Sequence, residues 1–208
     1  MAKNIVEEFQ KRLEGKTLRE ASDEEMLAFV MTQRSFNYEK LTHLLESSED
    51  WSAIIVAHIH ADHVVRCLLD QMLRNLDETK AERGRISFLD KLAFCFGLGA
   101  VSPASFSSLK RLNAERNKFA HRLNFVVSDE LKGDLLAHSI REYSTRLEER
   151  KEFKEADNGE IDFKTLLLLM VIFLEEERLA HSLQVLKSAR GEADLKDALA
   201  EASRVLNS

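Results

Sequence analysis

Four side chains that could bind metal ions or carry protons stand together in the segment HIHADH, His58 to His63. Three are histidines and the fourth is an aspartate. Imidazole nitrogens and carboxylate oxygens are common ligands of zinc and of other transition-metal ions. The order H-x-H-x-D-H therefore raises the possibility of a dinuclear metal site. Whether the side chains can converge depends on the element that carries them.

The same order of residues is the signature of metallo-β-lactamase-like hydrolases, where it lies on a loop after a strand. Here the flanking residues recur at steps of three and four, which predicts a helix. They are Ile54, Ile55, His58, Ala61, Asp62, Val65, Leu69, Met72, Leu73 and Leu76. On a helix, His58 and Asp62 share one face, whereas His60 and His63 share another. We therefore expect no metal site, a half-buried His58, and solvated or interfacial positions for His60 and His63.

Asp62 falls on the apolar face of this predicted helix. An unpaired carboxylate is costly to bury, so Asp62 needs a cation or hydrogen-bond donors from another element. The simpler interpretation is a salt bridge that links two helices. The functional interpretation is that Asp62 supports an active-site arginine or histidine, and we expect it to contact the neighbourhood of Arg116 and His121.

The segment LNAERNKFAHRL, residues 112–123, supplies that arginine and histidine. Asn113, Asn117 and His121 are spaced by four, so on a helix they form one polar stripe with Arg116 at its edge. Asn117 can hydrogen-bond an imidazole and fix its orientation. Arg116 presents a planar fork of donors that suits a phosphate group. A polar stripe near the core of a helical protein indicates a site.

The R-N-x-x-x-H pattern of this segment resembles the HEPN superfamily, whose hallmark is an arginine and a histidine separated by four to six residues. Arg116 and His121 are separated by four, and the polar residue that usually follows the arginine is Asn117. The similarity extends upstream over residues 87–123 and is nearest to the mannitol-operon repressor-like branch. The segment IVAHIHADHVVRCLLDQML resembles an earlier bundle helix of that branch, with Asp62 in an acidic position.

The resemblance implies a homodimer in which two motifs face one cleft, and active members of the superfamily are metal-independent endoribonucleases. It assigns catalysis to Arg116, Asn117 and His121, with Asn113 and Asp62 in support. A histidine would accept the 2′-hydroxyl proton while a second one protonates the leaving oxygen. Arg116 would stabilise the charge that develops on the phosphate. This implies an RNA-directed protein of toxin, defence or stress type, without a metal or other cofactor.

Two alternatives stay open. Many HEPN proteins, including repressor-like ones, are non-catalytic transcriptional or protein-interaction regulators, and a cognate antitoxin or regulatory protein would then be the partner. Alternatively, Arg116 and His121 form a polar network that only ties helices together. A net charge of -6 disfavours a broad RNA-binding surface. Locally, however, the motif helix is basic and offers RNA contacts, through Lys110, Arg111, Lys118 and Arg122.

Composition predicts the fold that positions these residues. The chain has 208 residues with only 7 Gly and 1 Pro, too few for the turns of a strand-rich protein. We predict an all-α, HEPN-like, single-domain bundle of about seven helices, with N-terminal helices over 1–50 and a HEPN-like core over 51–189. The expected helices cover 4–13, 23–45, 50–76, 87–97, 102–123, 128–154, 161–189 and 192–206. The longest apolar run, TLLLLMVIFL, is too short to span a bilayer, so we expect no membrane contact. No apolar segment follows the charged start, and the two cysteines match no disulfide framework, so we expect a cytoplasmic protein.

Overall fold

The computed structural model describes residues 5–73, 85–120, 126–149 and 161–206, with the side chains of 119–120 and 194–206 left aside. These residues form nine α-helices and one 3-10 turn, and they contain no strand, so the predicted all-α class is confirmed. The elements are α1 (Ile5–Arg12), η1 (Leu18–Glu20), α2 (Asp23–Met31), α3 (Tyr38–Ser47), α4 (Asp50–Met72), α6 (Phe88–Gly97), α7 (Pro103–Ala120), α8 (Asp129–Glu142), α9 (Ser144–Glu149) and α11 (Phe163–Leu206).

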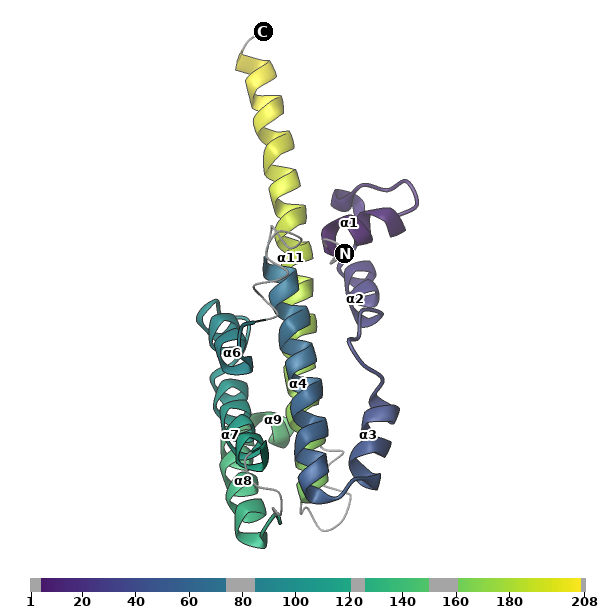
Figure 1. The fold of residues 1–208 in the computed structure, drawn as a ribbon. Helices are drawn as coiled ribbons and strands as arrows, with labels where there is room; N and C mark the ends of the chain where they lie inside the picture. The colour runs from purple at the N-terminus through teal and green to yellow at the C-terminus, as the bar shows by residue number, and fades with distance from the viewer. Residues whose placement is uncertain (1–4, 74–84, 121–125, 150–160, 207–208) are drawn as a thin grey trace.

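Two long helices, α4 and α11, lie side by side along the middle of the bundle (Figure 1). On one side α3 packs against both, and on the other α6 and α7 pack against α4 while α8 packs against α7 and α11. The N-terminal elements α1, η1 and α2 pack against α11 instead. The C-terminal part of α11 extends beyond the other helices. The central pair therefore provides the frame to which α6 and α7 are attached.

The described core consists of two apolar clusters. The larger one joins α3, α4, α6, α7, α8 and the first half of α11. The smaller one joins α1, η1 and α2 to Leu179 and Leu186 of α11. Of the helices within residues 1–50, α3 belongs to the larger cluster through Leu41 and Leu45, whereas α1 and α2 belong to the smaller one.

Helix α4 is long and apolar enough to cross a membrane, judged by length and composition. Half of its apolar window is buried within the molecule, and a core helix passes the same test. Its alanine and valine positions Ala53, Ala57, Ala61 and Val65 are fully buried, at a spacing of four that suits close packing of two helices. We interpret α4 as a core helix.

The helix predicted over 23–45 is two helices, α2 and α3, joined by residues 32–37. The reason lies far away in the sequence. The buried carboxylate of Glu175 on α11 accepts hydrogen bonds from the Ser35 backbone N (2.7 Å) and Oγ (2.9 Å). Arg178 donates to the backbone carbonyl of Gln33, and Asn37 caps α3 by accepting from Lys40 N. These bonds replace the helical ones that residues 33–35 would otherwise make.

Two further predicted boundaries are wrong. The helix expected over 128–154 divides at Tyr143 into α8 and α9, and residues 150–154 lie outside the described residues. At the division, the Tyr143 ring is buried against Phe173, with ring centroids 4.8 Å apart. Conversely, the two helices expected on either side of residue 191 are one helix, α11. Gly191 costs such a helix only about 1 kcal/mol relative to alanine, which does not end it.

Candidate functional site

A cleft opens where α4, α6 and α7 meet. It consists of two adjoining hollows of about 480 Å³ and about 420 Å³ that share His58, Asp62, Arg66 and Arg116. The first reaches toward the loop between α2 and α3, and the second lies between α4, the start of α6 and α7. The predicted residues Asp62, Asn113, Arg116 and Asn117 all line this cleft. The fold therefore brings together residues that the sequence separates by about fifty positions.

Asp62 is held by two cations. Its Oδ1 pairs with Lys91 Nζ of α6 at 2.5 Å, and its Oδ2 pairs with Arg66 Nη2 one turn along α4 at 2.7 Å. Burial raises the pKa of Asp62, but the hydrogen bonds and charges of Lys91 and Arg66 outweigh it, so the pKa lies below its usual value. The predicted helix-linking salt bridge is present. Among the described residues, the cations that pair with Asp62 are Lys91 and Arg66, and Arg116 is not one of them.

His58 is joined to Asn113 across α4 and α7. Its Nε2 lies 2.9 Å from Asn113 Oδ1, and the ring packs against Phe88 at 4.6 Å between centroids. Both His58 and Asn113 are buried, so His58 is more enclosed than the sequence predicts. Burial lowers the pKa of His58, the bond to Asn113 opposes this, and the charge of Arg116 lowers it further. The imidazole is therefore neutral near pH 7, and because Asn113 Oδ1 accepts, Nε2 carries the proton.

Arg116 is also a cation of the cleft. Within the described part of the chain, no carboxylate pairs with it. It is half-buried, and its guanidinium donates to the neighbouring Asn117 Oδ1 at 3.1 Å. It lines both hollows together with His58. His121, the expected imidazole partner of Asn117, lies outside the described residues. In sum, Arg66, Lys91 and Arg116 face this cleft against the single carboxylate of Asp62.

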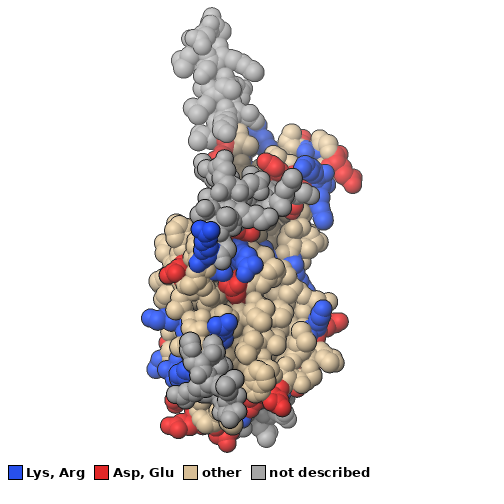
Figure 2. Space-filling view, viewed as in Figure 1, with Lys and Arg blue, Asp and Glu red and all other residues tan. Residues whose placement is uncertain are grey.

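The four predicted RNA-binding residues of the motif helix differ in what surrounds them. Lys110 is exposed, and Arg122 lies outside the described residues. Arg111 Nε and Lys118 Nζ pair with the buried Glu115 carboxylate at 3.3 Å and 2.8 Å, so much of their charge is neutralised. The face drawn in Figure 2 likewise shows basic and acidic groups interspersed over uncharged surface.

The HIHADH segment is helical, as predicted, and its side chains diverge. His60 Nδ1 hydrogen-bonds the Val56 carbonyl at 2.9 Å, and His63 Nε2 bonds the Ser35 carbonyl at 3.1 Å. Across the described ranges, no three His, Cys, Asp or Glu side chains are grouped as a metal ion would require. The segment contributes to the cleft by lining it from the α4 side.

Sequence reasoning did not identify Lys91, Arg66 or His58 as site residues. A signal for Lys91 existed: it occupies the buried face of α6 together with Phe88, Leu92 and Cys95. A lysine at such a position must meet an anion, just as Asp62 must meet a cation. For His58, the partner Asn113 is 55 positions away, and no local pattern links the two.

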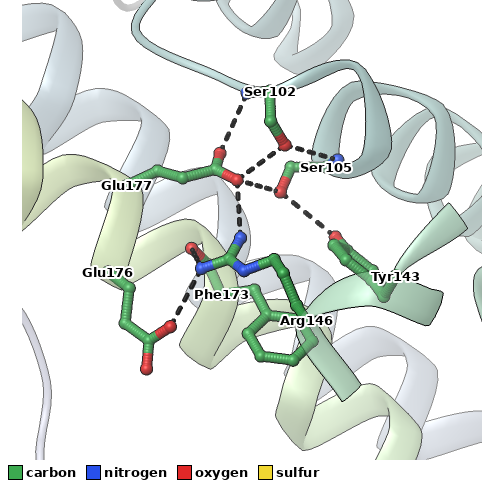
Figure 3. A network of polar contacts seen from close by, with 7 residues as sticks. All are labelled: Ser102, Ser105, Tyr143, Arg146, Phe173, Glu176 and Glu177. Atoms are coloured by element: carbon green, nitrogen blue, oxygen red, sulfur yellow. Dashed lines mark hydrogen bonds and ion pairs between the residues drawn. The ribbon is translucent and has the colours of Figure 1, made fainter. Parts of the chain in front are cut away.

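A second polar cluster, joining α7, α9 and α11, contrasts with the cleft (Figure 3). Glu177 accepts hydrogen bonds from Ser102 N (3.1 Å), Ser102 Oγ (2.7 Å), Ser105 Oγ (2.7 Å) and Arg146 Nη1 (2.7 Å). Arg146 also pairs with Glu176 and lies 4.3 Å from the Phe173 ring centroid. Here two carboxylates meet one cation, and none of these residues lines the two hollows described above.

Comparison with known proteins returned no matching family model, no matching curated protein and no matching solved structure. The resemblance to the HEPN superfamily therefore rests on the motif residues of the sequence, of which Arg116 and Asn117 lie on α7.

Proposed function

We propose that this protein is a HEPN-like cytoplasmic homodimer that binds single-stranded RNA in the α4–α6–α7 cleft and cleaves it without a metal ion. The observation that carries the proposal is Arg116, a half-buried guanidinium in a cleft, without a carboxylate partner among the described residues. A cation held partly away from water gains most from an anionic ligand. A phosphodiester is the anion for which the guanidinium fork is best suited.

The charge balance of the cleft supports a phosphate ligand. Asp62 neutralises part of the charge of Lys91 and Arg66, which leaves a surplus of two positive charges when Arg116 is included and His58 is neutral. The buried Lys91 and the bond between His58 and Asn113 fix the walls of the cleft. A phosphate that enters between them replaces water by donors that are already in position.

Cleavage is assigned to His121 through the resemblance. One imidazole accepts the 2′-hydroxyl proton while that oxygen forms a bond to the adjacent phosphorus. The bond from phosphorus to the 5′-oxygen breaks, and the imidazole of the second protomer donates a proton to that oxygen. The products are a 2′,3′-cyclic phosphate and a free 5′-hydroxyl. Positioned acid–base groups contribute roughly 10²–10⁴-fold to such a reaction, and Arg116 stabilises the extra charge on the phosphate.

The alternative function is that of a non-catalytic regulator whose main partner is a protein, such as an antitoxin or another regulatory protein. The observation that favours it is a group of exposed apolar side chains at the end of α6. Phe94 is 54% exposed and Leu98 is 56% exposed. Exposed aromatic and aliphatic groups of this kind are typical of protein interfaces.

A cleavage assay separates the two functions. Untagged, nuclease-free protein is incubated with mixed RNA in EDTA, and the ends of the products are analysed. The wild type and a control variant in α1, Lys11→Ala, should leave 2′,3′-cyclic phosphate ends. His121→Ala should abolish cleavage while it still binds RNA, and Arg116→Ala should weaken both. The regulator predicts no cleavage by the wild type, and activity that persists in His121→Ala would identify a contaminant.

A further inference from the structure

The cleft also contains aromatic and apolar groups that phosphate binding does not use. It is formed by Phe36 from the loop between α2 and α3, and by Ile59 and His60 of α4. The Phe36 and His60 rings meet edge to face, with centroids 5.8 Å apart. Ile59 is 59% exposed although it lies on the core helix α4, whose other face is buried. We call Phe36, Ile59 and His60 the ring subsite.

We propose that the ring subsite binds the base of a nucleotide whose phosphate lies on Arg116 and Arg66. The inference rests on the proposed function, because it places a ribonucleotide in the same cleft. Single-stranded RNA is commonly held by bases that stack on aromatic or histidine rings beside cations that bind the backbone. The first hollow contains both groups, since Arg66 and Arg116 line it together with the ring subsite.

The ring subsite is held rigidly before any ligand binds. Ser35, directly before Phe36, is bonded through its N and Oγ to the buried Glu175, and through its carbonyl to His63. Glu175 is in turn paired with the buried Arg178 at 2.8 Å. Such a buried pair costs free energy to form, and here it fixes the loop beside the cleft. A preorganised platform lowers the entropy lost when a ligand binds.

The size of the hollow suits one nucleotide. Its volume of about 480 Å³ lies within the roughly 300–1,000 Å³ of small-molecule sites, which combine apolar walls with a few polar groups. Its lining combines the cations Arg66 and Arg116 with the aromatic and apolar groups of the ring subsite. Because every base has a π-face, such a site distinguishes nucleotides from sugar phosphates more than it distinguishes one base from another.

Calorimetric titrations test the proposal with three probes, namely adenosine 5′-monophosphate, ribose 5-phosphate and inorganic phosphate. Stacking of one base should make the nucleotide bind about tenfold more tightly than ribose 5-phosphate. Ile59→Glu places a carboxylate at the hollow without removing core packing, and should weaken nucleotide binding about tenfold or more. Leu98→Glu is the matched control, because it changes an equally exposed apolar residue at the far end of α6.

His60→Ala provides a second readout, since its ring makes only a local bond to Val56 and an edge contact to Phe36. It should reduce the preference for the nucleotide over ribose 5-phosphate while phosphate binding is unchanged. Equal affinity of the wild type for both ligands would overturn the ring subsite, and so would equal effects of Ile59→Glu and Leu98→Glu. Nucleotide binding that depends on Ile59 and Arg116, without RNA cleavage, would support the subsite and disprove the nuclease. RNA cleavage by a protein that shows no preference for the nucleotide would support the nuclease and disprove the ring subsite.

Discussion

Two polar clusters of this molecule, the Glu177 network and the Asp62 cleft, use the same kinds of side chain in opposite proportions. In the first, Glu177 and Glu176 both pair with the cation Arg146, and Glu177 also accepts from the hydroxyl groups of Ser102 and Ser105. Around Asp62, one carboxylate faces Lys91, Arg66 and, across the cleft, Arg116. The first cluster is satisfied from within the protein. The second keeps a cation for which an external anion is the natural partner.

The comparison shows how a structural network can be distinguished from a binding site by its balance of charges. Both clusters join helices, and both contain buried charges, so burial alone does not separate them. The balance of donors and acceptors does, because a closed network stabilises the fold while an unbalanced one costs free energy until a ligand binds. The predictions below test this distinction, beginning with the largest expected effect.

Removing the acceptor of the closed network should be the most damaging change. Glu177→Gln leaves Arg146 with the more exposed Glu176 and disturbs the bonds from Ser102 and Ser105. The free energy of unfolding should fall by about 3 kcal/mol, as for other broken buried pairs. Denaturant titration measures it. Glu176→Gln, whose side chain is 36% exposed, is the matched control and should cost less than about 1 kcal/mol. Equal losses would show that Glu177 is not the centre of the network.

Removing the carboxylate of Asp62 from the cleft should lower the free energy of unfolding by less. It should also change how strongly phosphate stabilises the protein. Asp62→Asn leaves the buried Lys91 without its partner, so the free energy of unfolding should fall by roughly 1–3 kcal/mol. Because the cleft then carries a larger positive surplus, added phosphate should restore more of the melting temperature in the variant than in the wild type. A thermal shift that is the same in both proteins would argue against an anion site.

The smallest expected effect concerns pH and the neutral imidazole of the cleft. The folded protein lowers the pKa of His58 below its usual value of 6.5, mainly through burial. The stability that the folded protein gains from keeping His58 neutral is therefore fully present above pH 6.5. It is lost as the pH falls below that value, because the unfolded chain binds the proton first. His58→Gln should flatten this decline. His181, whose pKa burial also lowers, contributes with the same sign, so His181→Gln should leave the His58 part of the decline in place. An unchanged decline in His58→Gln would contradict the assignment.

Local signals were enough to predict the helical class and several helix starts. Ser22, Ser87 and Ser128 each cap a helix by accepting a backbone N–H three residues later, and such caps depend only on neighbouring residues. The division between α2 and α3 could not be predicted in this way, because the carboxylate that holds Ser35 is 140 positions away. Propensity likewise favoured an end at Gly191, where the helix continues.

Part of the candidate site could be predicted from local signals, whereas the rest depends on contacts between helices. Periodicity placed Asp62 on an apolar face and thereby predicted a cation partner, but only the packing of α6 against α4 selects Lys91. The same limit applies to the bond between His58 and Asn113, which joins two helices. The part of the predicted stripe formed by Asn113 and Asn117, with Arg116 at its edge, was visible because these residues lie on one helix. Its orientation toward α4 follows from tertiary contacts alone.

The most direct test of the central claim compares Arg116 with Arg146, the cations of the two clusters. Stability and affinity for a single-stranded RNA are measured for Arg116→Ala and Arg146→Ala, by denaturant titration and fluorescence anisotropy. Arg116→Ala should raise the Kd about tenfold or more and change the free energy of unfolding by less than about 0.5 kcal/mol. Arg146→Ala should lower the stability by about 2–3 kcal/mol and leave the Kd of the folded protein unchanged. If Arg116→Ala binds RNA as the wild type does, the cleft is not the RNA site.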